Sequence, residues 1–584
     1  MTKRLISFVL VLVMMALCVC TTVACGGDPK PCVTHVDGNG DGKCDNCSTA
    51  MEDPDNGGSG NNGGDDDDDD TGKKKDKNGD GVVDKWDEVD SFADRKGNKL
   101  ELTMQLSEYS DGEMTSGAKK YLAGPGESSA DTVLDLVYKR NYAAEEALGI
   151  HMNYVYINKG WSEIKGAIVE TEKNGVDTPD LYCDMIYDMM AASIENGVFK
   201  NLYRYTTENL YGYSDDYYQG GHFDFQDKYG YYTAYMDDLS LTEDKQFLMA
   251  SDFYLDVIRA LLLLPFNIDL YTSLVNPNDP EASGLYELVR EYNWTWDKMK
   301  EMCNIYSGGE ESMDETLVMA IAHGGLSAVA LVYSTELNVY SPVYAADGTQ
   351  TGYQINPTCS DMTVLFGKIK DLINTNGIYT DDTVLPEKQR EGINKCNEKF
   401  KNGTVLFATP TMMGALEEDV FQDMTYAMGV LPLPKLYEGS SYSYCSIING
   451  VGKVGALGFH SSNSEAMSAY IQYVTENSLA VLEAYYDDAM KNRYTDDAGS
   501  KDMLDLIYAS IGSQKTMIID ELLMNRSWAT MHPYTWTQLI RQDNFIGHAS
   551  DIAIQYGSCV PSKNSVLADV YSAWQKADQI VYES

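Results

Sequence analysis

The first strongly patterned part of the chain alternates short apolar runs with amphipathic stretches, and this alternation restricts the fold more than any other feature. The runs that we interpret as strands are "KLELTMQL" (99–106), "IHMNYVYIN" (150–158) and the first part of "DTPDLYCDMIYD" (177–188). Between them, residues 129–149 and 160–175 carry apolar side chains at helical spacing, and Gly149 is expected to end the first helix. This order of strands and helices predicts a parallel α/β sheet with right-handed crossovers.

Length and charge limit the function further. Residues 97–584 are numerous enough for two or more domains. The chain holds 89 acidic and 44 basic side chains, a formal net charge of −45, so its surface repels nucleic acid and anionic lipid. We find no G-x-S-x-G, H-E-x-x-H or P-loop motif, and therefore expect no enzyme. The widely spaced cysteines of this part are predicted to be buried thiols: Cys183, Cys303, Cys359, Cys396, Cys445 and Cys559.

Residues 1–24 have the pattern of a secretory signal. Lys3 and Arg4 precede an apolar stretch, Leu5 to Val19, which is short for a membrane span. The following "TVAC" resembles a lipobox, with Thr22 where Leu is usual, so we predict that Cys25 becomes the lipidated first residue. Two acyl chains give stable membrane anchoring. We therefore expect a lipoprotein on the extracellular face of the cytoplasmic membrane of a Gram-positive-type bacterium.

Residues 25–96 are expected to form a disordered acidic and Gly-rich tether, because they contain little apolar surface to bury. Within it, residues 32–47 hold Cys32, His35, Cys44 and Cys47 at a spacing that suits a metal ion. Outside the cytoplasm the same cysteines can instead form disulfides. A calcium reading of this cluster fails at its last position, which is Ser48. Both the metal and the disulfide readings stay open.

A second motif in the tether, "DKNGDGVVDKWDE" (76–88), has the residue order of a calcium loop. Calcium loops supply oxygen ligands from positions 1, 3, 5, 7, 9 and 12 and need Gly at position 6, which here is Gly81. Carboxylates and an amide fall on the ligand positions: Asp76, Asn78, Asp80, Asp84 and Asp87. Position 12 is usually Glu, so the loop is EF-hand-like or dockerin-like, and calcium in the tether is the one cofactor we expect. The alternative is a solvated linker.

Several segments of residues 97–584, taken in their order and spacing, resemble one family. They include "LTMQL", "VYKRNYAAEEALGIHMNYVYI", "DTPDLYCDMIYDMMAASIENGVFKNL", "LLPFNIDLY", "NWTWDKMKEMCNIY", "FKNGTVLFATPTMMGALEE", "MGVLPLPKLYEGSSYSY" and "YYDDAMKNRYTDDAGSKDMLDLI". The chain is similar here to the family 1 extracellular solute-binding proteins of carbohydrate ABC importers. The resemblance implies a two-lobed, type II-like periplasmic-binding-protein fold whose hinge lets the lobes close on a ligand. "PFNIDLY" (265–271) would then enter the second lobe, and "TVLFATPTMM" (404–413) would return near the cleft.

Ligand-binding residues are expected where strands end, because open α/β sheets bind ligands at the carboxyl ends of their strands. Sugars stack on aromatic faces, and their hydroxyl groups form hydrogen bonds with carboxylates and amides. The candidates are Glu108, Tyr109, Tyr187, Asp188, Asp237, Asp238, Thr411, Met412 and Trp536. By contrast, Trp294 and Trp296 are expected to be structural, with Thr295 at the N-cap of a helix that Trp296 begins.

These observations favour a monomeric, lipid-anchored receptor that captures a carbohydrate, an oligosaccharide, and delivers it to an ABC permease without a cofactor in the ligand site. One alternative is a surface glycan-adhesion or scaffold protein that recruits a partner through the calcium-like loop and imports nothing. A hydrolase is a third hypothesis, because abundant carboxylates always allow a catalytic pair. Peptides and other solutes remain alternative ligands, since a fold constrains the scaffold better than the site.

Overall fold

The structure is a computed structural model, and every residue it describes belongs to one compact unit, Lys74–Ser584. The described residues are 84–107, 118–159, 163–195, 197–226, 230–279, 281–306, 317–319, 330, 333–335, 339–355, 364–365, 367–368, 371, 378–380, 398–417, 421, 424–491, 497–526 and 564–577. The predicted lipidation site, the Cys/His cluster and the first calcium-loop positions lie outside them: Cys25, Cys32, His35, Cys44, Cys47, Asp76, Asn78 and Asp80.

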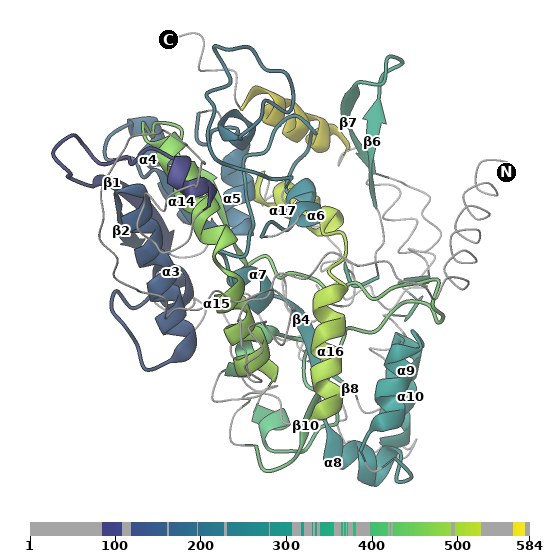
Figure 1. Ribbon diagram of the computed structural model, residues 1–584. Helices are drawn as coiled ribbons and strands as arrows, with labels where there is room; N and C mark the ends of the chain where they lie inside the picture. The colour runs from purple at the N-terminus through teal and green to yellow at the C-terminus, as the bar shows by residue number, and fades with distance from the viewer. Residues whose placement is uncertain are drawn as a thin grey trace, which may run out of the picture. The chain divides into compact units, whose positions relative to one another are not determined.

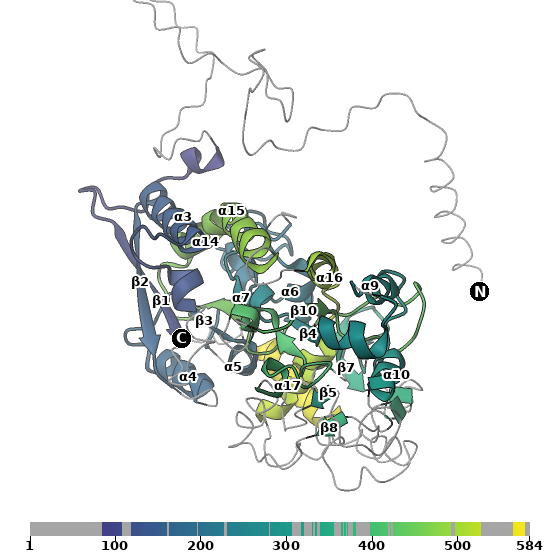
Figure 2. The same cartoon turned by 90° about the horizontal axis from the view of Figure 1, so that it is seen from below.

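A four-stranded sheet, which we call the first sheet, has the order β11-β3-β1-β2. Its strands are β1 (Leu100–Ser107), β2 (Ile150–Ile157), β3 (Leu181–Met185) and β11 (Lys453–Leu457). β1 pairs in parallel with β2 and β3, whereas β11 is antiparallel to β3. Figure 2 shows β2, β1 and β3 side by side. The predicted parallel α/β unit is confirmed, and a strand from late in the chain extends it.

The helices of the first sheet begin and end where local chemistry dictates. In α3 (Thr132–Leu148), the Asp131 side chain accepts hydrogen bonds from the amides of Val133 and Leu134, and this caps the helix. Gly149 ends α3 with φ 65°, a left-handed conformation that glycine adopts at little cost. The sheet is also flanked by α4 (Ile164–Asn174), α5 (Ile186–Ser193), α14 (Ser464–Glu476) and α15 (Leu479–Glu483), and Figure 1 shows α3 and α14 near β1 and β2.

A second sheet has the order β10-β4-β9, with β4 (Leu262–Asn267) antiparallel to both neighbours, β9 (Thr411–Met412) and β10 (Met428–Leu431). Helix α16 (Ala498–Ala509) packs on β10 and on α9 (Ser283–Arg290). Two further pairs of strands are β5 (Leu317–Met319) with β8 (Ile378–Thr380), and β6 (Tyr340–Tyr344) with β7 (Gln350–Ile355). The residues predicted to enter the second lobe, "PFNIDLY" (265–271), form the end of β4, the short helix α8 (Ile268–Leu270) and the first residue of the next helix.

The shorter and remaining elements connect these layers. They are the 3-10 helices η1 (Lys85–Glu88), η3 (Leu202–Tyr205) and η6 (Met413–Glu417), the π-helices η2 (Ala118–Ala123), η4 (Tyr271–Val275) and η7 (Ala484–Lys491), and the α-helices α6 (Thr233–Asp238), α7 (Asp256–Arg259), α8 (Ile268–Leu270), α10 (Trp296–Tyr306) and α17 (Lys515–Arg526), with a last helical stretch over 564–576.

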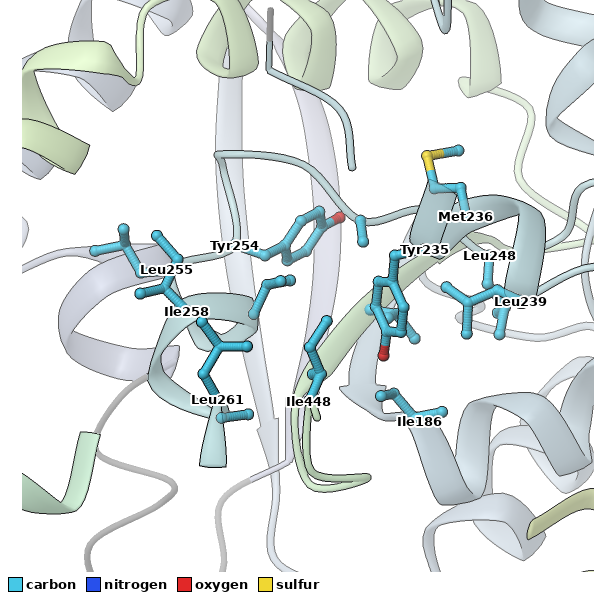
Figure 3. Packing of buried hydrophobic residues seen from close by; sticks show 14 of the residues in the cluster. Ile186, Tyr235, Met236, Leu239, Leu248, Tyr254, Leu255, Ile258, Leu261 and Ile448 are labelled. Carbon is cyan, nitrogen blue, oxygen red and sulfur yellow. The ribbon is translucent and has the colours of Figure 1, made fainter. Parts of the chain in front are cut away.

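The chain passes between the two sheets through short segments that hydrogen-bond to one another. The amide of Leu262 donates to Ile447 O at 2.9 Å, and the amide of Asn449 donates to Ala260 O at 2.9 Å. A third segment joins them, because Ser446 N donates to Ser510 O at 2.7 Å. Figure 3 shows the side chains of Leu261 and Ile448 close together in the apolar packing around these segments. Two sheets joined by paired crossing segments give the expected two-lobed α/β class.

Residues 84–96, which composition assigned to the tether, are folded onto the first sheet's helices. Trp86 is only 2% exposed, and its ring lies 5.2 Å from that of Tyr473 on α14. Its indole N–H donates to Glu476 at 3.0 Å, and Lys85 forms an ion pair with the same carboxylate at 2.5 Å. The folded part of the chain therefore includes the end of the calcium-like motif.

We expect Trp86→Ala to destabilise the chain by about 3–5 kcal/mol, the usual cost of truncating a buried aromatic side chain. Urea denaturation, followed by circular dichroism, measures this change in the free energy of unfolding. The matched control is Lys85→Ala, which removes an exposed ion pair worth less than about 1 kcal/mol. Equal, small effects of both substitutions would contradict the docking of this segment.

Candidate functional site

The carboxyl ends of β1 and β3 meet the start of β11 in a buried polar cluster. Ser107 donates its hydroxyl hydrogen to Asp184 Oδ1 at 2.8 Å, and the Lys453 ammonium donates to Ser107 Oγ at 3.2 Å. All three side chains are at most 3% exposed. Parallel strands bring their carboxyl ends to one edge of the sheet, so this cluster occupies the edge where ligands bind in open α/β sheets.

A second cluster surrounds Arg259 at the end of α7, just before the chain enters β4. The guanidinium forms ion pairs with Glu417 on η6 and with Asp256 Oδ1, the latter at 3.4 Å. It also lies over the ring of Tyr121 on η2, 4.8 Å from the centroid. Glu417 accepts hydrogen bonds from the Tyr485 hydroxyl at 2.5 Å and from the Tyr121 hydroxyl at 2.9 Å. The cluster thus joins residues from four elements that are distant in the sequence.

The two clusters form one electrostatic unit, which we call the junction: Ser107, Tyr121, Asp184, Asp256, Arg259, Glu417, Lys453 and Tyr485. The ammonium of Lys453 lowers the pKa of both Asp184 and Asp256, although burial, the larger effect, raises the pKa of each. Burial also acts to lower the pKa of Arg259, but Tyr485, Glu417 and Asp256 together raise it above its ordinary value. Each charge at the junction is therefore stabilised by a partner of opposite sign.

Tyr187 and Asp188, predicted from the turn after β3, lie beside the junction at the start of α5. Tyr187 is half-buried and lies so close to Gly450 that a Cβ there would come within 2.2 Å of its ring. Because Gly450 lies between the crossing segment Ser446–Asn449 and β11, this contact brings Tyr187 to the crossing segments. Of the predicted residues, Tyr187 is the one best placed to meet a ligand at the junction.

Asp188 is 3% exposed and acts as a helix cap. Its Oδ1 accepts from the amide of Lys165 in the first turn of α4, a helix that the side chain of its N-cap residue, Glu163, does not cap. Its Oδ2 is buried without a hydrogen-bond partner among the described residues. Burial, with a contribution from Asp184, raises the pKa of Asp188 to about 7. A contact with ligand stays a prediction for this residue.

Thr411 and Met412 form β9 and pair with Leu263 and Leu262 of β4. Thr411 is buried, whereas Met412 is partly exposed and packs with Tyr333 against the apolar cluster around Leu262. Since Leu262 also bonds to the crossing segment at Ile447, β9 lies on the second-sheet side of the crossing segments. The structure therefore brings Met412 and Tyr187 to the same stretch of the chain, Met412 against the cluster of Cys445 and Ile447 and Tyr187 against Gly450.

Asp237 and Asp238 are the last two residues of α6. Asp238 accepts from the amide of Gln514 at 2.5 Å and from the Ser513 hydroxyl at 3.2 Å, just ahead of α17. In return, Lys515 donates to the carbonyl oxygens of Asp237 and Asp238 at the C-terminus of α6, at 2.7 and 3.2 Å. Each helix end is capped by a charge of suitable sign. The contacts of these two residues are with 513–515, none of which belongs to the junction.

Three predicted ligand residues, Glu108, Tyr109 and Trp536, lie outside the described residues. The structural role expected of Trp294 and Trp296 is confirmed, because both are buried and Trp296 begins α10. Thr295 Oγ1 accepts from the amide of Lys298 at 3.3 Å, as an N-cap residue does. The three cysteines of the described part, Cys183, Cys303 and Cys445, are buried.

Sequence reasoning missed the centre of the junction, Arg259 with Glu417 and Tyr485. One signal was present, because Arg259 stands between the apolar runs of "FYLDVIRALLLL", and a charge in such a context must be paired when it is buried. The sequence does not indicate which residue pairs with Arg259, since Glu417 lies 158 residues away in the chain. Nothing in the sequence pairs residues across such a distance.

Of the two cations of the junction, Arg259 pairs with Glu417 and Asp256, and Lys453 donates to Ser107 Oγ. Its partly exposed members, Tyr121 and Glu417, suit a polar ligand that stacks on a ring and shares hydrogen bonds. Within the described ranges, three or more His, Cys, Asp or Glu side chains nowhere gather in a group that could hold a metal ion. A helix long and apolar enough to cross a membrane is likewise absent from the described part of the chain.

Comparison with known proteins finds likenesses among solved structures, while no family model and no curated protein matches. The GacH receptor of Streptomyces glaucescens is 11% identical with a TM-score of 0.45 and covers 80% of this chain and 99% of its own. The galacto-N-biose/lacto-N-biose I-binding protein of the Bifidobacterium longum ABC transporter is 12% identical, with a TM-score of 0.48 and coverages of 82% and 98%. Maltose-bound MalE3 of T. maritima is 13% identical, with a TM-score of 0.43 and coverages of 79% and 99%. At these identities the likenesses assign no ligand to this chain.

We expect Asp188→Asn to stabilise the chain more at pH 8 than at pH 5. The folded state holds its proton up to about pH 7, whereas an unfolded Asp releases it near pH 4, so the wild-type chain loses stability as pH rises through this window. Asn keeps the acceptor for Lys165 N and removes the titration. The difference between the two pH values should amount to about 2–3 kcal/mol in urea denaturation.

Ser193→Ala, at a buried side chain that does not titrate, is the control and should change the stability equally at the two pH values. If the stability difference between Asp188→Asn and wild type were the same at pH 5 and pH 8, Asp188 would be ionised in the folded chain, against the account above.

Proposed function

We propose that this chain is a solute receptor, not an enzyme, that binds a carbohydrate at the junction and delivers it to an ABC importer. The observation that carries the proposal is the pairing of the crossing segments beside partly exposed ring and carboxylate groups. A ligand that touches both Tyr187 next to the first sheet and Met412 next to the second would favour one arrangement of the two halves. An importer can read such a change of arrangement as the signal that ligand is bound.

Carbohydrate is the ligand class that best suits the groups at the junction. Tyr121 and Tyr187 present partly exposed rings, on which the C–H faces of sugars stack, and Glu417 provides a carboxylate for hydroxyl groups. The family resemblance of the sequence implies the same class, and the three matched structures are of proteins that bind acarbose, lacto-N-biose and maltose. An oligosaccharide is the first ligand to test.

The receptor would be attached to the membrane through its N-terminal residues. Lipidation at Cys25 would anchor it to the extracellular face of the membrane, and residues 26–83 would let the folded part reach an importer. Calcium bound at the 76–87 motif would stabilise the end of this tether. Because Asp84 and Asp87 cap η1 and Trp86 packs in the chain's own core, the motif's end serves this molecule itself. This favours a receptor over a scaffold that recruits partners through the motif.

A thermal-shift screen of the full chain in a mild detergent, against mono- and oligosaccharides, peptides and amino acids, tests the ligand class. A ligand at about a hundredfold its dissociation constant adds roughly 2.7 kcal/mol to the folded state, enough to raise the melting temperature measurably. We expect a selective rise with one group of oligosaccharides. A rise with peptides alone would contradict the carbohydrate assignment. If the chain cut the oligosaccharides of the screen into shorter sugars, the proposal that it is not an enzyme would be wrong.

Tyr121→Ala and Tyr187→Ala should each weaken binding of the sugar found in that screen by about tenfold, because each removes a ring face worth about 1.4 kcal/mol. Isothermal titration calorimetry measures the dissociation constants. The control is Tyr142→Ala, which removes a 51% exposed tyrosine on α3 that stacks on Tyr138. Unchanged affinity of both junction variants would place the sugar site elsewhere.

A further inference from the structure

A tyrosine-rich loop between α5 and α6 forms a surface that the junction does not use. Four of its tyrosines follow one another through ring contacts, with centroids 4.7 Å apart for Tyr203–Tyr211, 5.9 Å for Tyr211–Tyr213 and 4.9 Å for Tyr213–Tyr217. Tyr211 is 41% exposed and the other three are partly exposed. We call these four residues the tyrosine surface.

The tyrosine surface is held from beneath by polar contacts of buried side chains. The amide of Asn201, which is fully buried, donates to the hydroxyl oxygens of Tyr213 and Tyr217, each at 3.2 Å. Arg204, also buried, lies 4.6 Å from the centre of the Tyr217 ring and donates to its carbonyl oxygen at 3.0 Å. These rings are therefore fixed in position while part of each ring stays exposed, as in a preformed binding surface.

The charge around this surface has one sign. In the described residues 197–226 and 230–245, the exposed charged side chains are all acidic: Glu208, Asp215, Asp216, Asp237, Glu243 and Asp244. Among the basic side chains of the same residues, Arg204 is buried and Lys200 and Lys245 are partly buried, and each is bonded to the protein. Lys200 donates to Ser461 O and Ser464 Oγ, Arg204 lies against Tyr217, and Lys245 donates to Gln575 O.

The loop itself attaches to the helices of the first sheet. His222 N donates to Ser468 Oγ and Asp224 N donates to Gln472 Oε1, both on α14, at 3.0 and 2.9 Å. Through His222 the loop also contacts Trp86, where the tether joins the folded part, with ring centroids 6.0 Å apart. The tyrosine surface thus belongs to one lobe and is built independently of the crossing segments.

We propose that the tyrosine surface is a second binding site, for a glycan chain that carries free amino groups. The exposed rings take the C–H faces of sugars, and the surrounding carboxylates attract ammonium groups, which also interact favourably with tyrosine faces. Charge complementarity excludes uronic-acid and phosphate polymers. The loop from 203 to 217 exposes rings and polar groups, with Leu210 its one aliphatic residue, and offers no strand edge for a peptide. The site would hold the receptor on a glucosamine-containing polymer while the junction binds its own ligand.

The test is biolayer interferometry of the full chain, in a mild detergent, on immobilised glucosamine hexamer and on N-acetylglucosamine hexamer at 0.05 and 0.15 M salt. We expect binding to the amino form at least fivefold tighter than to the acetylated form, and weaker at the higher salt concentration. Tyr211→Ala, and separately the pair Asp215→Asn and Asp216→Asn, should each weaken binding about fivefold, the size of one exposed cation–aromatic or ionic contact.

The controls separate this site from general charge and from the junction. Tyr344→Ala, at a tyrosine that is 56% exposed on β6, and Glu127→Gln, at an exposed carboxylate, should leave binding of the amino hexamer unchanged. Tyr187→Ala should leave it unchanged too. Equal binding of the acetylated hexamer, no effect of Tyr211→Ala, or equally tight and Tyr211-dependent binding of hexalysine would each overturn the proposal, the last in favour of a site for cationic peptides.

Discussion

The backbone hydrogen bonds between the crossing segments are the constraint on which the rest of the structure depends. Residues Ala260–Leu262, Ser446–Asn449 and Ser510 lie at the boundary between the two sheets, and each satisfies its peptide groups with another of these segments. Buried peptide groups must be paired, so the segments cannot separate without a large cost. The two sheets are thereby joined at a defined place.

The same place gathers several buried charges. Asp184, Asp256, Arg259 and Lys453 are removed from water beside the partly exposed Glu417, and a buried charge is tolerated only when a partner and hydrogen bonds accompany it. Such a network depends on the positions of α7, η6 and β11 at once, so a change in the arrangement of the two halves alters its energy. The contacts of the junction therefore link residues beside the first sheet, at β11, to residues beside the second sheet, at α7 and η6.

Local pattern was sufficient to predict the elements of the first sheet. The strands β1, β2 and β3 and the helices α3 and α4 lie where apolar periodicity, Asp131 and Gly149 indicate, because these signals act within a few residues. The candidate site was harder to predict, since Asp188 and Asp238 follow the expected pattern of ligand residues yet cap α4 and α17. A cap of this kind depends on a helix that is distant in the chain, and so does the docking of Trp86 on Tyr473. Composition cannot indicate such contacts, which arise from packing.

The central claim is that two halves joined by the crossing segments close on a carbohydrate at the junction. The most direct test measures a distance by Förster resonance energy transfer. The two dyes are attached to non-natural amino acids that replace Tyr142 on α3 and Leu274 on η4, both of which are exposed. The account predicts that the sugar which raises the melting temperature shortens this distance reversibly, in proportion to site occupancy. Saturating sugar that binds without changing the distance would contradict it.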